Sequence, residues 1–445
     1  MRSLLLVLGL ASTLILAIGC GEPPPQVRQP NILLISLDAL RADHLSCYGY
    51  DRQTSPFLDE LAADGTRFSQ AFVNTHGTPP SHTTMLSSLY QETHRVGYGG
   101  GTPEGRNDVI PEQVEMVQQI LQRNGWRTVA VTGGGYMSEI FGFGRGFGSF
   151  SGKASSIEQG TDLMIKELEE EQNRPIFAFL HTYQIHSPYD PPNHYRDLWD
   201  TGESDIDGSN ESLVPIQNRA HEVLEKKDFD HLEALYDGEI RFTDTTLRSF
   251  FSDLERIGFM DDALVIITSD HGEEFGDHGG LLHRVSLYEE LLHIPVILYG
   301  NGIARGRVDP TLISLIDIAP TILSAAGLPT TPNMEGRNLL GDLSSPRWQD
   351  QRVFAQYTSL RYAIRTPRFK LIQNPNKDRI QLFDLRHDPG ENRNIRRRHE
   401  DLAASLLAEL EEWKRTLPEP INLEATQANL PPETLEELRA LGYVD

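Results

Sequence analysis

Several short segments of the chain are apolar at almost every position and lack the apolar–polar alternation of a half-exposed strand. They cover residues 32–37, 128–131, 176–180, 264–268 and 294–299. Continuous apolarity is typical of strands in a parallel sheet that helices cover on both faces. The pattern therefore predicts parallel strands at the centre of the molecule.

The segments between these strands carry apolar residues at helical spacing. Clear examples cover residues 54–63, 112–124 and 232–257. Strands that alternate with helices are typical of an α/β protein with helices on both faces of its sheet. We therefore expect residues 31–345 to form an α/β domain with a doubly wound, mostly parallel sheet.

The pattern changes beyond residue 345. Residues 363–372 and 380–385 look like two antiparallel strands joined by a polar turn that contains Asn, Pro and Lys. Helical spacing follows over residues 400–415 and again over 432–442. We therefore expect a small C-terminal subdomain with an antiparallel sheet and a tail helix over residues 346–445.

The first residues have the composition of a targeting segment. A positive start at Arg2 precedes an apolar run from Leu4 to Ile18, with small residues around Cys20. We predict that residues 1–20 are a secretory signal peptide. Its end resembles a bacterial lipobox, which implies that Cys20 is lipidated and anchors the protein in the periplasm or outer membrane. An ordinary cleaved signal with an incidental Cys20 is the alternative.

The proline-rich residues 21–30 then predict a stiff polar tether. Cys47 is the remaining cysteine after this segment, so the mature protein is expected to have no internal disulfide.

The charge balance limits the partners. The chain has 40 Lys and Arg against 64 Asp and Glu, a formal net charge of −24. Because nucleic-acid phosphates are bound by clustered cations, this balance argues against a nucleic-acid partner. An anionic substrate would approach against the mean field, so a metal ion or a few placed cations must supply positive charge locally.

Two of the predicted strands end in a carboxylate. Asp38 follows the first strand, and Asp270 and His271 follow the strand over residues 264–268. Ligand sites of open α/β sheets lie outside the carboxyl ends of the strands. A single strand-end Asp is commonly a helix cap, but two acids with one imidazole are a ligand set suited to Mn, Zn, Ca or Mg. The sequence therefore predicts a metal site.

A threonine precedes two prolines at Thr78-Pro79-Pro80. We predict that Thr78 is the N-cap of a helix that continues through Leu89, with Pro79 at the first helical position. A hydroxyl there lies at the positive end of the helix dipole, and metal coordination can make it a nucleophile. A role as a cap alone is the alternative.

Histidines also gather near strand ends. His186 lies just past the strand over residues 176–180, and His278 and His283 lie in the loop after the Asp270 strand. Each of them could be structural, but several on one sheet edge favour an oxyanion pocket with His as donor or general acid. The glycine-rich residues 133–135 and 142–146 do not have dinucleotide-binding spacing, so we interpret them as turns near the site.

Together these segments resemble the sulfatase family of the alkaline phosphatase superfamily, from about residue 31 to residue 385. Six motifs occur in order: Asn31-Ile-Leu-Leu-Ile-Ser-Leu-Asp38 with Arg41-Ala-Asp43 and Tyr48-Gly49; Thr78-x-Pro80-Ser81; Thr268-Ser-Asp270-His271-Gly272; Leu287-Tyr-Glu-Glu290 with Ile294-Pro295; Asp317-Ile-Ala-Pro-Thr321; and Leu382-Phe-Asp-Leu385 with Asp388-Pro389. The resemblance implies an alkaline-phosphatase-like fold.

The resemblance also implies roles for single residues. It implies one divalent ion, Mn, Zn or Ca, held by Asp38, Asp270 and His271, with Thr78 as nucleophile. His186 and His283 are then expected to contact the sulfuryl or phosphoryl oxygens. The expected substrate-binding residues beside them are Ser81, His82 and Arg284.

Three positions depart from the family's usual pattern. Typical sulfatases have Cys or Ser at the position of Thr78, which is converted to formylglycine, and Arg at the position of His82. Thr78 is not expected to mature in this way. The frequent second acid after the first metal ligand is Ala39 here, which favours Mn or Zn over Ca. This set looks more like the threonine-nucleophile branch, the phosphodiesterases and phosphoglycerol transferases.

We therefore predict an extracytoplasmic, metal-dependent hydrolase that cleaves a sulfate or phosphate ester of an anionic small molecule or glycan through Thr78. A phosphothreonine intermediate can be displaced in line by water, whereas a threonine sulfate ester is harder to clear. Two alternatives remain open: a catalytically silent sulfatase fold that binds an anionic glycan, and a transferase that hands the Thr78-bound group to an alcohol.

Overall fold

The computed structural model describes residues 29–97, 108–170, 173–283, 286–341, 343, 348, 351–421 and 427–443. The predicted signal peptide and most of the tether lie outside these residues. None of the helices in the described ranges has both the length and the apolarity that a membrane crossing requires.

The centre of the molecule is an eight-stranded, mostly parallel sheet with the strand order β10-β2-β9-β6-β1-β5-β3-β4. Its strands are β1 (Asn31–Leu37), β2 (Thr66–Phe72), β3 (Arg127–Val131), β4 (Ser149–Ser151), β5 (Ile176–Thr182), β6 (Ala263–Thr268), β9 (Val296–Gly300) and β10 (Arg307–Ser314). β1 lies between β5 and β6 and is parallel to both. Residues 32–37 are completely buried, as their continuous apolarity predicts.

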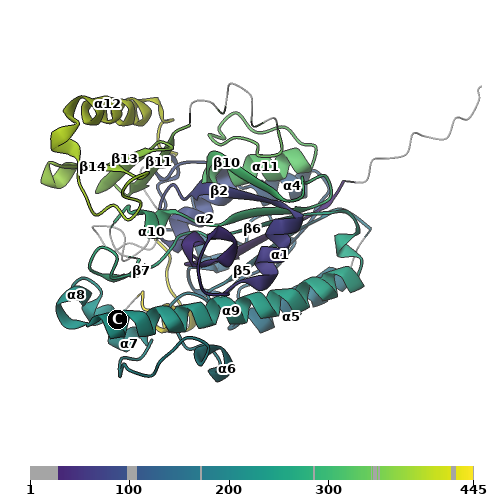
Figure 1. The fold of residues 1–445 in the computed structure, drawn as a ribbon. Coiled ribbons are helices and arrows are strands. Elements are labelled where there is room, and N and C mark those ends of the chain that lie inside the picture. Colours follow the sequence, from purple (N-terminus) through teal and green to yellow (C-terminus); the bar gives the residue numbers. More distant parts are fainter. Residues whose placement is uncertain are drawn as a thin grey trace, which may run out of the picture.

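Helices cover both faces of this sheet (Figure 1). One face packs against α1 (Pro56–Asp64), α5 (Ile157–Glu170) and the long α9 (Lys226–Arg256), and the other against α2 (Thr78–Ser87), α4 (Val117–Arg123) and α11 (Ile318–Ala325). The alternating side chains of each strand therefore enter two separate apolar layers. The predicted doubly wound α/β fold is confirmed.

The structure differs from the prediction in the direction of one strand and in the number of strands. The apolar segment over residues 294–299 becomes β9, which runs antiparallel to both β6 and β2. Continuous apolarity reports burial on both faces of the sheet and carries no information on strand direction. The strands β2, β4 and β10 were not predicted. The edge strand β10 contains Pro310 and a bulge between Asp309 and Leu312, which interrupt its strand pattern.

A separate antiparallel sheet follows, built from β11 (Val353–Tyr357), β12 (Arg361–Arg365), β13 (Phe369–Asn374) and β14 (Arg379–Asp384). Helix α12 (Glu400–Thr416) covers it, as Figure 1 shows. The segment predicted as one strand over residues 363–372 is two strands, because a turn at Thr366-Pro367-Arg368 divides it. The Thr366 N–H donates to the Phe369 carbonyl at 2.8 Å and closes this turn.

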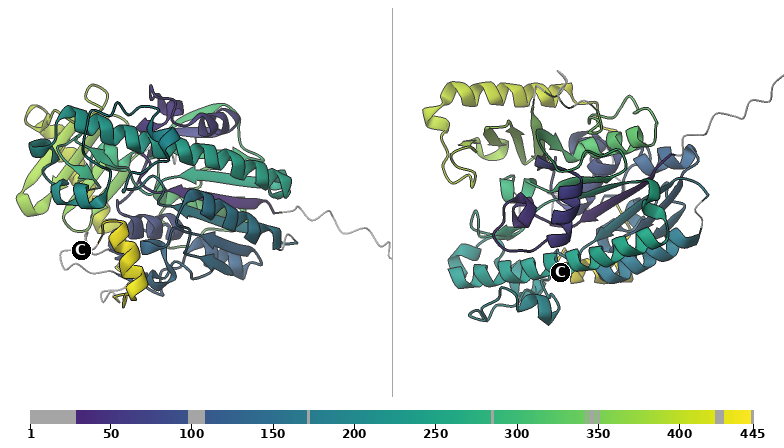
Figure 2. Two further views of the ribbon diagram at one scale, coloured as in Figure 1. Left: turned by 90° about the horizontal axis from the view of Figure 1, so that it is seen from below. Right: turned by 45° about the vertical axis from the view of Figure 1, so that its right-hand side comes forward.

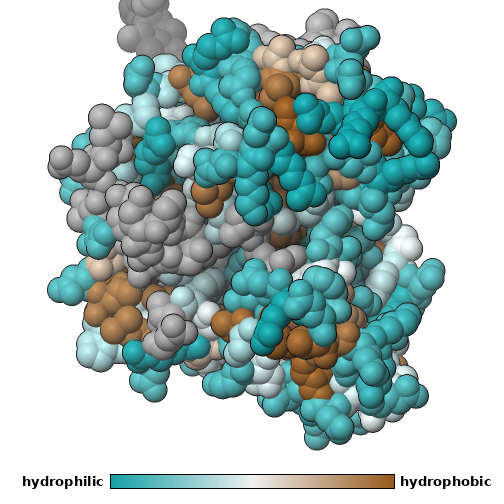
Figure 3. Space-filling view, turned by 90° about the vertical axis from the view of Figure 1, so that its left-hand side faces the viewer, coloured by the Kyte–Doolittle hydropathy of each residue, from teal (hydrophilic) through white to brown (hydrophobic). Residues whose placement is uncertain are grey.

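The last described helix, α13 (Pro432–Ala440), packs against the α/β domain rather than against the C-terminal sheet. Its neighbour is the short 3-10 helix η3 (Gly135–Met137), and Figure 2 shows α13 in yellow apart from the C-terminal sheet. Figure 3 shows one face of the molecule, which is mainly hydrophilic and carries several separate apolar patches.

Candidate active site

The two strand-end carboxylates meet at one edge of the sheet. Ser36 in β1 is paired with Thr268 in the parallel strand β6, so the residues that follow both strands lie side by side. Asp38, Asp270 and His271 are completely buried there. The next residue of the motif is Gly272, where a Cβ would collide with the Glu290 carbonyl oxygen, so this position accepts no side chain.

These three side chains present converging atoms. The candidate ligand atoms of Asp38, Asp270 and His271 lie within 4.8 Å of one another. His271 Nε2 is 3.7 Å from Asp38 Oδ1 and 3.5 Å from Asp270 Oδ2, and within the described part of the chain none of the three atoms has a hydrogen-bond partner. Buried polar atoms without partners are costly. A divalent cation among them would remove that cost, so the residues fit a metal.

The tautomer of His271 agrees with this role. Its Nδ1–H donates to the Gly272 carbonyl at 2.8 Å, which leaves the Nε2 lone pair directed at the two carboxylates. Burial raises the pKa of both the Asp38 and the Asp270 carboxyl groups. A bound cation would supply the charge that keeps them ionised.

The second oxygen of Asp38 contacts two other side chains. Asp38 Oδ2 lies 3.1 Å from His181 Nε2 and accepts a hydrogen bond from Thr78 Oγ1 at 3.2 Å. His181 is completely buried, and burial lowers its pKa to about 4, so the ring is neutral at ordinary pH. His181 was not among the predicted site residues, although its place near the end of the apolar strand β5 could have indicated it.

Thr78 begins α2 but is not its N-cap. Gly77 occupies the N-cap with φ of 97°, a conformation that favours glycine, so Thr78 and Pro79 are the first and second helical residues. The helix ends at Ser87, two residues earlier than predicted, and Ser88 adopts the left-handed conformation. The predicted cap at Thr78 is therefore wrong by one residue, because the positive φ of Gly77 turns the chain into the helix.

Two of the expected substrate-binding residues hold the start of α2 together. The Ser81 hydroxyl donates to the Thr75 carbonyl at 2.6 Å. His82 Nδ1 donates to the Thr78 carbonyl at 2.8 Å, and its Nε2 lies 2.9 Å from the Ser36 hydroxyl. Burial lowers the pKa of His82 to about 3. Both residues lie beside the site with their polar atoms engaged within the chain, so their contact with substrate stays a prediction.

His186 and His283 lie together next to the metal ligands. Their rings are 5.0 Å apart between centroids, and the His283 ring is 4.5 Å from that of His271. His186 Nδ1 donates to the Ser187 carbonyl at 2.6 Å, and His283 Nδ1 lies 3.1 Å from Glu273 Oε1. Both Nε2 atoms are therefore left to contact groups within the site. The remaining predicted residue, Arg284, lies outside the described residues.

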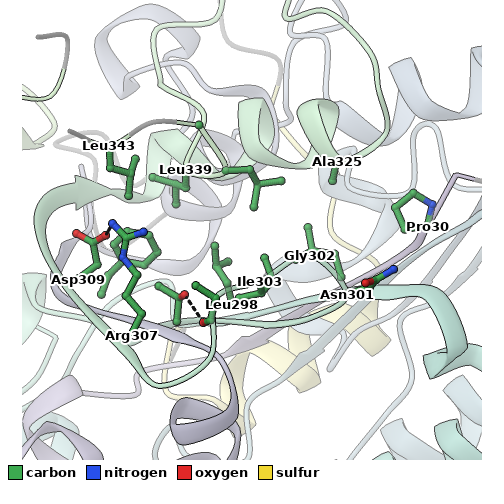
Figure 4. A pocket seen from close by; sticks show the side chains of 16 residues that line it. Pro30, Leu298, Asn301, Gly302, Ile303, Arg307, Asp309, Ala325, Leu339 and Leu343 are labelled. Atoms are coloured by element: carbon green, nitrogen blue, oxygen red, sulfur yellow. Dashed lines mark hydrogen bonds and ion pairs between the residues drawn. The ribbon is translucent and has the colours of Figure 1, made fainter. Parts of the chain in front are cut away.

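Two cavities lie at opposite ends of the strands of the sheet. One, of about 350 Å³, adjoins the site through Tyr183 and His186 and includes Lys153, Gln184 and Glu437 in its lining. The other, of about 290 Å³, lies at the amino end of β1, where Arg307 pairs with Asp309 at 2.6 Å (Figure 4). Among the described residues, the lining of this second cavity contains no histidine. The carboxyl edge of the sheet therefore carries the candidate chemistry.

Comparisons with known proteins agree with this fold. The model of the family described as Sulfatase matches residues 30–328, and that of the N-sulphoglucosamine sulphohydrolase C-terminal region matches residues 276–416. The chain belongs to the sulfatase family. It is a sulfatase-like ester hydrolase, of a family whose enzymes depend on a divalent metal.

Individual relatives are distant but cover most of the chain. An arylsulfatase of Clostridium perfringens is 23% identical over 82% of this chain and 90% of its own. A structure described as a complex with the substrate D-glucosamine-2-N,6-O-disulfate superposes with a TM-score of 0.72 at 20% identity, covering 89% of this chain and all of the other. The phosphonate monoester hydrolase of Agrobacterium radiobacter reaches 0.71 at 20% identity, with 90% and 100% covered.

Proposed function

We propose that this protein hydrolyses a sulfate or phosphate ester with Thr78 as nucleophile and a divalent ion held by Asp38, Asp270 and His271. One observation carries the proposal. The Thr78 hydroxyl hydrogen-bonds to Asp38, whose other oxygen converges with Asp270 Oδ2 and His271 Nε2 as atoms that lack partners in the described structure. A hydroxyl is thus positioned next to a ligand set that a cation would complete.

The chain's own residues divide the reaction between them. Thr78 Oγ attacks the sulfur or phosphorus atom, the ester bond to the alcohol breaks, and the alcohol leaves. Asp38 Oδ2 is positioned to accept the Thr78 proton. The Nε2 atoms of His186 and His283 border the place of the transferred group. When bound, a divalent ion would lower the pKa of the hydroxyl and of water, and would offset the charge of the ester oxygens.

The identity of the nucleophile bears on which ester is cleaved. A threonine hydroxyl cannot become the formylglycine hydrate that releases sulfate by elimination. The group transferred to Thr78 must instead leave by attack of water, and in-line displacement is well suited to a phosphothreonine. We therefore propose phosphate or phosphonate esters first and sulfate esters second.

The test is a panel of aryl sulfate, phosphate monoester, phosphate diester and phosphonate monoester, assayed with purified protein and Mn, Zn or Ca. We expect turnover of at least one ester, loss of that turnover on chelation, and recovery on return of the metal. Thr78→Ala should abolish it, whereas Thr78→Ser, which keeps a hydroxyl, should retain a part. Calorimetry should show that Thr78→Ala still binds metal and that Asp270→Asn binds it more weakly.

The panel also distinguishes the alternatives. If no ester is turned over in a Thr78-dependent reaction, the proposed hydrolase is ruled out. Glycan binding that survives both chelation and Asp270→Ala would then identify a silent binding protein. Ligand atoms that have no hydrogen-bond partner among the described residues argue against a lost site. A phosphorylated or sulfated glycerol formed when glycerol is added would identify a transferase.

We further propose that the protein acts outside the cytoplasm, as a lipoprotein anchored through Cys20 in the periplasm or outer membrane. The apolar run before Cys20 and the small residues around it support this proposal. Palmitate labelling of the expressed full chain should modify the wild type and not Cys20→Ser. Cys47→Ser is the matched control and should label normally. Equal labelling of the wild type and Cys20→Ser would contradict the anchor.

A further inference from the structure

A residue far away in the sequence contacts the candidate nucleophile. The Tyr443 hydroxyl lies 3.1 Å from Thr78 Oγ1 and 3.0 Å from His186 Nε2. Its ring packs at 4.8 Å from Tyr136 and 5.8 Å from His283, between ring centroids. The phenol thus lies between the nucleophile and a histidine of the site, 365 residues along the chain from Thr78.

The end of α13 directs Tyr443 into the site. The Tyr443 N–H donates to the Leu438 carbonyl at 2.9 Å and the Gly442 N–H to the Arg439 carbonyl at 2.9 Å. These two bonds form the Schellman motif, whose glycine takes the left-handed conformation. Gly442 has φ of +78°, and a Cβ there would lie 2.9 Å from the Asn210 side chain. The chain therefore reverses at Gly442 and places the next side chain over Thr78.

The helix is attached to the α/β domain by specific contacts. The Glu437 carboxylate accepts a hydrogen bond from the Gly135 N–H at 2.8 Å, and Asn210 Nδ2 donates to the Ala440 carbonyl at 2.8 Å. Leu438 is completely buried. Residues Glu437, Ala440 and Leu441 also line the cavity of about 350 Å³ that adjoins His186. α13 is thus one wall of the candidate active site.

We propose that Tyr443 is a catalytic residue of this protein, whose phenol donates its hydrogen bond to the Thr78 oxygen when that oxygen has lost its proton. The inference rests on the proposed function, because it requires Thr78 to be the nucleophile. The proposal adds Tyr443, which α13 brings to the site, to the residues that act on the substrate. It also makes α13 a wall of the space for the leaving group.

The hydrogen positions explain this role. His186 Nδ1 is occupied by the Ser187 carbonyl, so Nε2 of the neutral ring accepts from Tyr443, and the Thr78 hydrogen is directed to Asp38. The hydroxyl hydrogens of Thr78 and Tyr443 are therefore both used in other hydrogen bonds. No hydroxyl hydrogen lies between Thr78 Oγ1 and the Tyr443 oxygen, which are 3.1 Å apart. Once Thr78 has lost its proton, Tyr443 can donate to the Thr78 oxygen instead. The hydrogen bond from Tyr443 is thus made when the Thr78 oxygen carries negative charge, where such a bond is strongest.

The test is Tyr443→Phe, which keeps the ring and removes only the hydroxyl, in the full-length metal-loaded protein. We expect kcat to fall at least about tenfold, as for loss of one donor to a developing anion, with KM changed less. Tyr195→Phe on α6 (Asn193–Arg196) is the matched control and should have unchanged kcat. Gly442→Ala, which strains the turn, should lower kcat in the same direction. Circular dichroism and thermal unfolding should show all three variants folded.

Other outcomes would overturn the inference. If Thr78-dependent turnover is unchanged in Tyr443→Phe, the phenol is not catalytic. If turnover rises, Tyr443 blocks the nucleophile rather than assisting it. If the wild type shows no Thr78-dependent turnover, the proposed function itself fails and takes this inference with it. Vanadate binding measured by calorimetry is a second readout, and binding as tight to Tyr443→Phe as to the wild type would also contradict the inference.

Discussion

Each oxygen of Asp38 has a different neighbourhood. Oδ1 faces Asp270 and His271 and has no hydrogen-bond partner among the described residues, whereas Oδ2 contacts His181 and Thr78. The Gly133 N–H donates to His181 Nδ1 at 3.4 Å, so His181 Nε2 carries the hydrogen and donates to Asp38. A hydrogen bond to a ligating carboxylate orients the ligand and supports its charged form. His181 is therefore a positioning residue for the metal site.

This role predicts that His181→Leu, which keeps the volume and removes the donor, weakens Mn or Zn binding about 10- to 100-fold. His181→Gln, which can present an N–H to Asp38, should recover a part of the affinity. Isothermal titration calorimetry with the metal alone measures this. The exposed His194→Leu is the control. Equal affinities of the wild type and His181→Leu would show that His181 does not support the site.

At the scale of elements, α9 connects to the segment that carries His186. Glu239 on α9 is buried and accepts hydrogen bonds from the Asp190 N–H at 3.0 Å and from Gln184 Nε2 at 2.8 Å. Both donors belong to the segment after β5 in which His186 lies. Burial raises the pKa of Glu239 from 4.5 to about 7, although these donors favour the ionised form.

A raised pKa makes stability depend on pH in a definite direction. The folded protein binds the Glu239 proton more tightly than the unfolded chain, so this contribution is complete below pH 4.5 and is lost as the pH rises to about 7. Between pH 4.5 and 8, the free energy of unfolding of the wild type should therefore fall relative to that of Glu239→Gln. The change should reach up to about 3 kcal/mol, at about 1.4 kcal/mol per pKa unit.

Urea unfolding at several pH values measures this difference. The exposed Glu222→Gln is the control and should follow the wild type at every pH. A constant difference between the wild type and Glu239→Gln across the range would mean that Glu239 has an ordinary pKa in the folded protein.

At the scale of the whole molecule, a buried lysine joins the C-terminal sheet to the α/β domain. Lys370 on β13 is completely buried, and its Nζ lies 3.0 Å from Glu289 of α10 (Glu289–Leu292) and 3.1 Å from Glu391. Arg365 on β12 contacts Glu289 at 3.2 Å. Burial alone would raise the pKa of Glu289, but Arg365 and Lys370 hold it at about 2. Burial raises the pKa of the second acid, Glu391. The two parts are thus joined by a buried network of two cations and two carboxyl groups.

Removal of the lysine should destabilise the protein strongly. Lys370→Met leaves Glu391 and one side of Glu289 as buried carboxylates without their cation, which costs about 3–5 kcal/mol in comparable cases. Thermal or urea unfolding should show this loss, with the exposed Lys377→Met as a control that changes little. A Lys370→Met variant as stable as the wild type would show that the network does not hold the two parts together.

The groups that follow the strand ends could be predicted, because their positions depend on the sequence close to each strand. A continuous apolar strand is buried, parallel strands end at the same edge, and so Asp38 and Asp270-His271 were expected to meet, as they do. The proline pair predicted the start of α2 to within one residue. The direction of β9 could not be predicted, because a strand buried on both faces looks the same in either direction.

The class of fold, the buried strands and the carboxylate, imidazole and hydroxyl groups near their ends could be read from the amino-acid sequence, because burial and periodicity are properties of neighbouring residues. The side chains that surround those groups follow from the packing of the folded chain. His181 reaches Asp38 from an adjacent strand, and Tyr443 reaches Thr78 across 365 positions of the chain. Contacts of this kind depend on how separate elements pack, and no local pattern carries that information.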